Sequence, residues 1–108
     1  MLIKANSMLT ESGLRAAIES EHRALAELRQ RIDEEPLRLL LQSASNTLSF
    51  VSMAFLAPNV MERVRTPEEL RSWFGQAARH IERAKQIRHE VEAAMDLRQD
   101  GAGGPAHG

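Results

Sequence analysis

Histidines and carboxylates are the side chains in this sequence that could hold a metal ion or move a proton. The 108 residues include four His and no Cys, which excludes disulfides, a thiol nucleophile and thiolate metal ligands. Glu19 and His22 have the Glu-x-x-His spacing that places two ligands on one helix in di-metal bundles. No second such motif is present, and on a regular helix Glu19 points away from the apolar face. We therefore expect no metal site and no cofactor.

His80 and Arg83 form a second group of residues that could do chemistry. The segment from His80 to Ala84, HIERA, resembles the His-x-x-Lys/Arg-small pattern of histidine-phosphotransfer domains, which are helical bundles of similar length. The resemblance covers five residues and departs from the pattern at Glu82, usually apolar, and at Lys85, usually small. It implies that His80 would accept a phosphoryl group, which is one alternative function. A histidine packed at the edge of the apolar face is the other interpretation of His80.

The charges of the chain are mixed. The formal net charge is −1, so there is no overall attraction to nucleic acid or to anionic lipid. Basic residues gather between Arg79 and Arg88, but Glu82, Glu90 and Glu92 interleave with them and no aromatic residue there could stack on a base. We expect no nucleic-acid partner.

These candidates flank a stretch of nineteen uncharged residues, Leu39 to Ala57, around which the rest of the chain is organised. On a helix this stretch has two faces with the 4, 3, 4, 3, 4 spacing of helical packing. The inner face comprises Leu37, Leu41, Ala44, Leu48, Val51 and Phe55. The outer face lies about 200° around the helix and comprises Leu39, Ser43, Asn46, Phe50, Met53 and Ala57. Because neither face is charged, we expect both to be covered, the outer one by a second copy of the chain.

The predicted homodimer interface combines the outer face with the end of the last helix. Its residues are Leu39, Asn46, Phe50, Met53, Ile87 and Val91. A lone Asn in such a helical interface can fix the register and the oligomeric state. The alternative is an exposed polar face in which Phe50 and Met53 remain partly solvated.

The uncharged stretch is also about as long as a helix that spans a membrane. Seven of its nineteen residues are Gln, Ser, Asn or Thr, and no Lys/Arg cluster flanks one end. A span is therefore not expected, and peripheral membrane binding stays an alternative. The first residues lack a continuous apolar run and a cleavage site, which favours a cytoplasmic location.

Helical periodicity and helix-boundary residues predict an all-α fold, an antiparallel three-helix bundle with helices at about 11–34, 36–57 and 67–98. Thr10 or Ser12 can cap the first helix, and Pro36 suits the start of the second. Thr66-Pro67-Glu68-Glu69 reads as a capping box. The bundle domain would cover 10–99, with a flexible arm at 1–9 and a disordered Gly-rich tail at 100–108.

Two charged residues, Glu21 and Arg88, fall on the apolar faces of their helices. A buried ion costs several kcal/mol unless it is paired, so they either pair with each other across subunits or mark where the faces leave the core. The sequence as a whole predicts a non-enzymatic interaction module, an adaptor, chaperone-like or regulatory protein whose partner is itself, with a helical protein as a further candidate.

Overall fold

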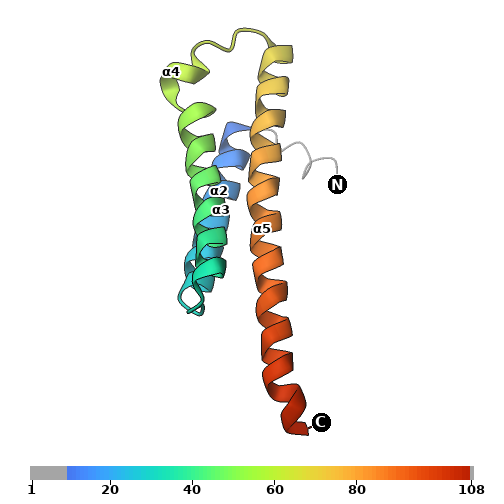
Figure 1. Ribbon diagram of the computed structural model, residues 1–108. Coiled ribbons are helices and arrows are strands. Elements are labelled where there is room, and N and C mark those ends of the chain that lie inside the picture. Colours follow the sequence, from blue (N-terminus) through green and yellow to red (C-terminus); the bar gives the residue numbers. More distant parts are fainter. Residues whose placement is uncertain (1–9, 108) are drawn as a thin grey trace.

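The computed structural model describes the backbone of residues 10–107 and the side chains of residues 10–97. Within this range the chain is all-α, without a strand, and its four helices are α2 (Glu11–Arg29), α3 (Glu35–Ala54), α4 (Pro58–Met61) and α5 (Pro67–His107). The three long helices lie side by side, with α3 antiparallel to α2 and α5, and α4 is a single turn in the α3–α5 connection (Figure 1). The all-α prediction is confirmed, whereas the predicted count of three helices omits α4. The predicted arm at 1–9 lies outside the described residues.

Helix α2 begins where the sequence predicts and ends earlier. Thr10 is its N-cap, and its hydroxyl oxygen accepts a hydrogen bond from the amide of Gly13 at 3.0 Å. The helix ends at Arg29 and not near 34, and the amides of Arg31 and Ile32 then bond to carbonyls three residues back. These tighter turns keep Ile32 buried while the chain reverses towards α3.

Helix α3 also ends earlier than predicted, at Ala54. Pro58 explains this end, because it has no N–H to donate to the Ala54 carbonyl four residues before it. The carbonyls that follow are bound by side chains of other helices. Trp73 Nε1 donates to the Phe55 carbonyl at 2.8 Å, and Arg15 Nη2 donates to the Leu56 carbonyl at 2.6 Å.

Helix α5 begins with the predicted capping box. The Glu69 amide donates to Thr66 Oγ1 at 3.0 Å, and the Thr66 amide donates to Glu69 Oε1 at 3.1 Å. Glu69 Oε1 also accepts from the Arg65 amide at 3.0 Å. These backbone hydrogen bonds, from Arg65 and then Thr66, lower the pKa of the Glu69 carboxyl.

The far end of α5 differs from the prediction. We expected the helix to end near Arg98 and residues 100–108 to be disordered, but the backbone of α5 continues to His107. The prediction of disorder rested on the lack of apolar content in this Gly-rich tail, since such a segment has little surface to bury. Once a helix is nucleated, each further residue adds one backbone hydrogen bond, and the helix that begins at Pro67 continues into this segment. Residue 108 lies outside the described range.

The length of α5 gives the molecule its shape. Its 41 residues correspond to about 61 Å at 1.5 Å per residue, and the molecule measures 61 × 31 × 16 Å. The 19 residues of α2 and 20 of α3 give helices half as long. The C-terminal part of α5 therefore projects beyond the α2–α3 hairpin (Figure 1).

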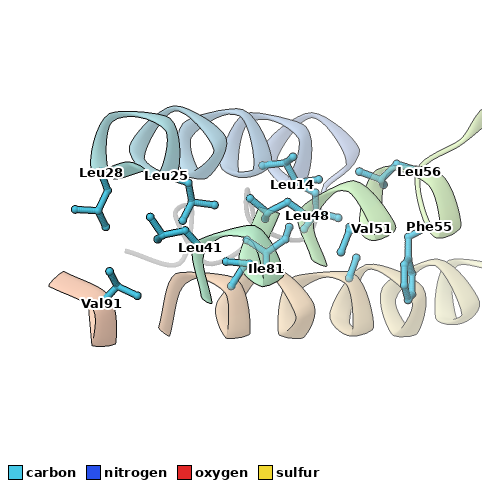
Figure 2. Close-up of a cluster of buried hydrophobic side chains, with 14 of the residues drawn as sticks. Leu14, Leu25, Leu28, Leu41, Leu48, Val51, Phe55, Leu56, Ile81 and Val91 are labelled. Carbon is cyan, nitrogen blue, oxygen red and sulfur yellow. The ribbon is translucent and has the colours of Figure 1, made fainter. Parts of the chain in front are cut away.

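The core lies between the three long helices, and it contains the residues that periodicity predicted. Leu14, Leu25 and Leu28 of α2 point towards Leu41 and Leu48 of α3 and towards Ile81 and Val91 of α5 (Figure 2). Every member of the predicted inner face is buried: Leu37, Leu41, Ala44, Leu48, Val51 and Phe55. Among the described residues, no helix is both long and apolar enough to cross a membrane.

Candidate interaction surface

The outer face of α3 is exposed along its whole length. The side chains of Leu39, Phe50 and Met53 are 60, 49 and 72% exposed. Asn46 lies between them, also exposed, and its Oδ1 accepts a hydrogen bond from Gln42 Nε2 at 2.9 Å. Within the described part of the chain, these apolar residues are not covered by another helix. Large exposed apolar residues on one helix face are typical of an interaction surface.

A groove runs beside this face, between α3 and α5, and we call it the α3–α5 groove. It has a volume of about 580 Å³. Its lining residues are Leu39, Gln42, Ser43, Asn46, Thr47 and Phe50 from α3, with His80 and Arg83 from α5. Three of the predicted interface residues, Leu39, Asn46 and Phe50, are thus brought together on one wall. The groove combines apolar walls with neutral hydrogen-bonding groups and one cation.

His80 is part of an aromatic cluster at one end of this groove. Its ring centroid lies 5.4 Å from that of Phe50 and 5.5 Å from that of Phe55. Phe55 in turn packs on Trp73 with ring centroids 4.7 Å apart. The Phe50 ring is thus in contact with Phe55 and His80 on one side and exposed on the other, which matches the interpretation of His80 as a packed residue at the edge of the apolar face.

Two cations beside the groove have no ion-pair partner among the described side chains. Arg79 and Arg83 are exposed, and neither forms an ion pair with any described side chain. Arg15 and Arg23, by contrast, pair with Glu11 and Glu19 one helical turn earlier, at 2.8 and 3.9 Å. Unpaired guanidinium groups beside an apolar groove favour a partner that carries carboxylates.

Two of the predicted interface residues occupy other positions. Val91 is completely buried in the chain's own core, so it cannot contact a partner, and its inclusion in the interface was wrong. Ile87 is partly buried and packs against the same core. The prediction assumed that α5 leaves the bundle at Ile87, whereas α2 and α3 accompany it as far as Val91. Among the described side chains on the projecting part of α5, Leu97 is a large apolar residue that is 72% exposed.

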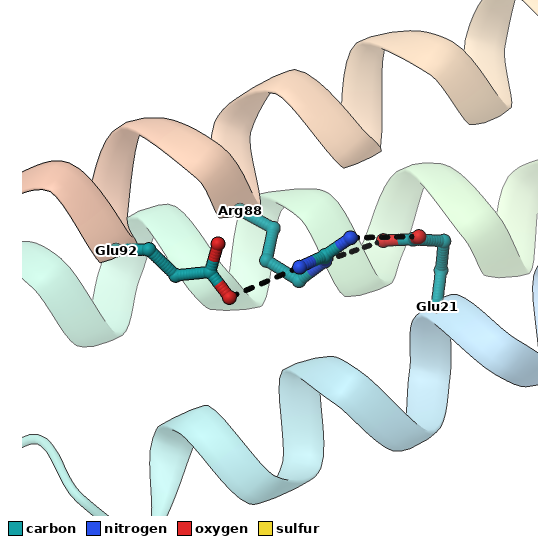
Figure 3. Close-up of polar contacts among 3 residues, drawn as sticks. All are labelled: Glu21, Arg88 and Glu92. Carbon is teal, nitrogen blue, oxygen red and sulfur yellow. Dashed lines mark hydrogen bonds and ion pairs between the residues drawn. The ribbon is translucent and has the colours of Figure 1, made fainter.

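Glu21 and Arg88 meet inside one chain. Arg88 Nε donates to Glu21 Oε1 at 2.8 Å and Nη2 to Oε2 at 3.1 Å, while Nη1 bonds to Glu92 Oε2 at 3.0 Å (Figure 3). The Glu21 hydrogen bond raises the pKa of the Arg88 guanidinium, against the opposing effect of burial. The pair therefore joins α2 to α5 within the bundle and is not available to link subunits.

Glu19, which has the metal-ligand spacing to His22, lies on the exposed side of α2. The Glu19 side chain is 80% exposed and pairs with Arg23, and the intervening Glu21 is bound to Arg88. No group of three or more His, Asp or Glu side chains that could hold a metal ion occurs within the described residues.

Sequence reasoning missed the α3–α5 groove and the second role of Arg15. The periodicity of α3 assigns Leu39 and Phe50 to one face but does not show which helix borders it. The i,i+4 spacing identifies the Glu11–Arg15 pair, while the bond from Arg15 to the Leu56 carbonyl joins residues 41 positions apart and has no local signal. Comparison with known proteins found no matching family model, no matching curated protein and no matching solved structure.

Proposed function

We propose that the protein is a non-enzymatic helical interaction module that associates with a second copy of itself through the outer face of α3. One observation carries the proposal: Leu39, Phe50 and Met53 are exposed on a helix that has no charge from residue 39 to its end. A face that only meets water gains solubility from charged residues, and this one has none.

The absence of charge on the outer face of α3 is also the reason for proposing a second copy as the partner. An uncharged face can pair with itself without like-charge repulsion, and a two-fold interface uses the same patch on both subunits. Asn46 can contribute to such a pair, because its amide nitrogen remains free to donate while its oxygen accepts from Gln42.

The test is the dissociation constant of the dimer, measured by sedimentation equilibrium for matched Asp variants. Leu39→Asp places a charge on the outer face at a side chain that makes few contacts in its own chain. Ala16→Asp is the control, since Ala16 is exposed on the far side of α2. We expect Leu39→Asp to weaken association at least tenfold, roughly the effect of losing one important interface side chain. Ala16→Asp should leave it unchanged.

Equal dissociation constants for the two variants would contradict the proposal. Circular dichroism on the same samples excludes unfolding as the cause, because both substitutions are at exposed helical positions and should leave helix content as in the wild type.

The phosphotransfer alternative makes a different prediction. An acceptor histidine must present a ring nitrogen to a phosphorylated partner, and His80 should then become labelled by phosphorylated receiver domains, with the label lost in His80→Gln. The contacts of His80 with Phe50 and Phe55 instead support its role in fixing the interaction surface.

A further inference from the structure

A second groove, between α2 and α3, has an arginine on each of its walls, and we call it the α2–α3 groove. Its volume is about 460 Å³. Arg29, in the last turn of α2, lines one wall, and Arg38, at the end of the first turn of α3, lines the other. Both arginines lie at the same end of the hairpin, because the short connection between the two helices places the end of α2 beside the start of α3.

The two guanidinium groups of this groove are not balanced by a carboxylate. None of the described residues that line the groove is Asp or Glu. Arg29 and Arg38 form no ion pair with any described side chain, and Arg29 Nη1 donates a long hydrogen bond of 3.4 Å to the neutral Oε1 of Gln42. Two like charges on opposite walls of one groove repel each other, and an anion between them would turn this repulsion into attraction.

Helix stability accounts for only one of these arginines. Arg29 in the last turn of α2 complements the negative end of that helix dipole. Arg38 lies close to the start of α3, where a cation opposes the positive end of the dipole. The helix itself therefore disfavours Arg38, whereas an anion in the groove would favour it.

Neutral hydrogen-bond donors line the groove together with the two arginines. They are the amides of Gln30 and Gln42 and the hydroxyl of Ser45, and each can donate to a further oxygen of a bound anion. The planar guanidinium group binds phosphate oxygens in pairs. A phosphate monoester carries a charge of about −1.5 to −2 at pH 7, which matches two guanidinium groups, whereas a carboxylate would leave one of them unbalanced.

We infer that the α2–α3 groove is a binding site for a doubly charged phosphate group, held between Arg29 and Arg38. The group can come from free phosphate or from the headgroup of a lipid phosphomonoester, because both present the same oxygens and charge. The site is separate from the proposed self-association, which uses the outer face of α3.

Nuclear magnetic resonance of the arginine Nε–H groups tests the site directly. The wild-type protein is titrated with inorganic phosphate, and chloride keeps the ionic strength constant. We expect the Nε–H signals of Arg29 and Arg38 to shift and saturate. Arg71 is the internal control, since it is exposed on α5 and lies away from the groove, and its signal should not saturate. Absence of a saturable shift at Arg29 and Arg38, or the same shift with acetate, would overturn the assignment to a phosphate group.

Matched variants provide an independent readout. Arg29→Gln and Arg38→Gln should each raise the dissociation constant for phosphate at least tenfold, roughly the effect of losing a charge-assisted hydrogen bond. Arg71→Gln should leave this constant unchanged. All three substitutions are at exposed positions, so circular dichroism should show wild-type helix content. Equal affinities for Arg38→Gln and Arg71→Gln would mean that phosphate binds by general charge attraction and not in the groove.

Flotation in a density gradient distinguishes the two sources of phosphate. If vesicles of phosphatidylcholine with phosphatidic acid carry the wild-type protein upward but leave Arg38→Gln at the bottom, the lipid headgroup is the ligand. A wild-type protein that stays at the bottom, yet binds phosphate in solution, has a soluble ligand.

The outcome for this site is independent of the outcome for self-association. Leu39→Asp, which should weaken the dimer, should bind phosphate as the wild type does. Loss of phosphate binding in Leu39→Asp would overturn the separate site and place the anion at the dimer interface.

Discussion

The guanidinium of Arg88 on α5 and the carboxylate of Glu21 on α2 face each other in a two-point ion pair, with N–O distances of 2.8 and 3.1 Å. Both side chains are largely buried, at 14 and 10% exposed. Bidentate geometry satisfies both carboxylate oxygens and fixes the two helices relative to each other along their axes. The pair therefore sets the register of α2 against α5 within the bundle.

Removing one member of this pair should destabilise the fold strongly. Glu21→Ala leaves Arg88 largely buried without its principal partner, and we expect a loss of about 3 kcal/mol in the free energy of unfolding. Urea unfolding followed by circular dichroism measures it. Glu92→Ala is the control, because Glu92 is 43% exposed and should cost less than about 1 kcal/mol. Equal losses for the two variants would show that the buried pair does not hold α2 on α5.

Replacing both members together should be much less harmful. The Glu21→Leu/Arg88→Met double variant removes both largely buried charges and fills the same space with apolar atoms. Glu92 loses its Arg88 partner, but at 43% exposed it remains solvated. We expect its stability to equal or exceed that of the wild type. A double variant as unstable as Glu21→Ala would mean that the ion pair itself is indispensable.

Phe55 and Phe50 are five positions apart on the chain and should respond to Asp in opposite ways. Phe55 is 6% exposed, so Phe55→Asp buries a charge in the core and should abolish the folded state. Phe50→Asp loses ring contacts worth about 1 kcal/mol, and it should keep its helix content while losing the dimer. Circular dichroism and light scattering on both variants distinguish these results. A dimer that survives Phe50→Asp would remove Phe50 from the interface.

The capping box at the start of α5 should contribute measurably to stability. Thr66→Ala removes the acceptor of the Glu69 amide and should cost about 1 kcal/mol. Ser72→Ala, at an exposed position further along the same helix, is the control and should have no such cost. Chemical unfolding of the two variants gives the comparison, and equal stabilities would contradict a role for the cap.

The Glu69 carboxylate makes this contribution dependent on pH. Its pKa is lowered in the folded state by the Arg65 and Thr66 amides, so its stabilising effect is present above the unfolded pKa near 4.5. The effect is lost as the pH falls through the lower folded value. Glu69→Gln keeps an acceptor oxygen without the charge. We expect it to be less stable than the wild type near pH 7 and to match it in strong acid, as measured by thermal unfolding across the pH range.

Periodicity was sufficient to predict the inner face of α3, because a helix that is buried on one side has apolar residues at every third or fourth position. It likewise placed Glu21 and Arg88 on buried faces. It could not show that they meet, since they are 67 positions apart and their contact depends on how α2 and α5 pack. Helix ends were predicted well where a local capping signal exists, as at Thr10 and Thr66. The end at Arg29 was predicted poorly, because the turn there is set by tertiary packing. At Ala54 the error was to extend the helix up to Pro58, although the missing N–H of Pro58 ends it four residues earlier.

In the predicted interface, too, the sequence pattern gave the positions that depend on one helix and failed for those that depend on helix packing. Leu39, Phe50 and Met53 lie on the side of α3 opposite its inner face. The spacing of the apolar residues in the sequence is sufficient to predict this position. The burial of Val91 depends on how far α2 and α3 extend along α5, which spacing does not give. The α3–α5 groove also arises only when the two helices are side by side, and so does the position of Arg83 on its wall.

The most direct test of this account is the molar mass of the wild-type protein, measured by light scattering behind a sizing column across a concentration series. The account predicts a mass that rises towards twice 12.1 kDa as concentration increases. A mass that stays at 12.1 kDa up to the highest soluble concentration would contradict the proposal that the outer face of α3 is covered by a second copy.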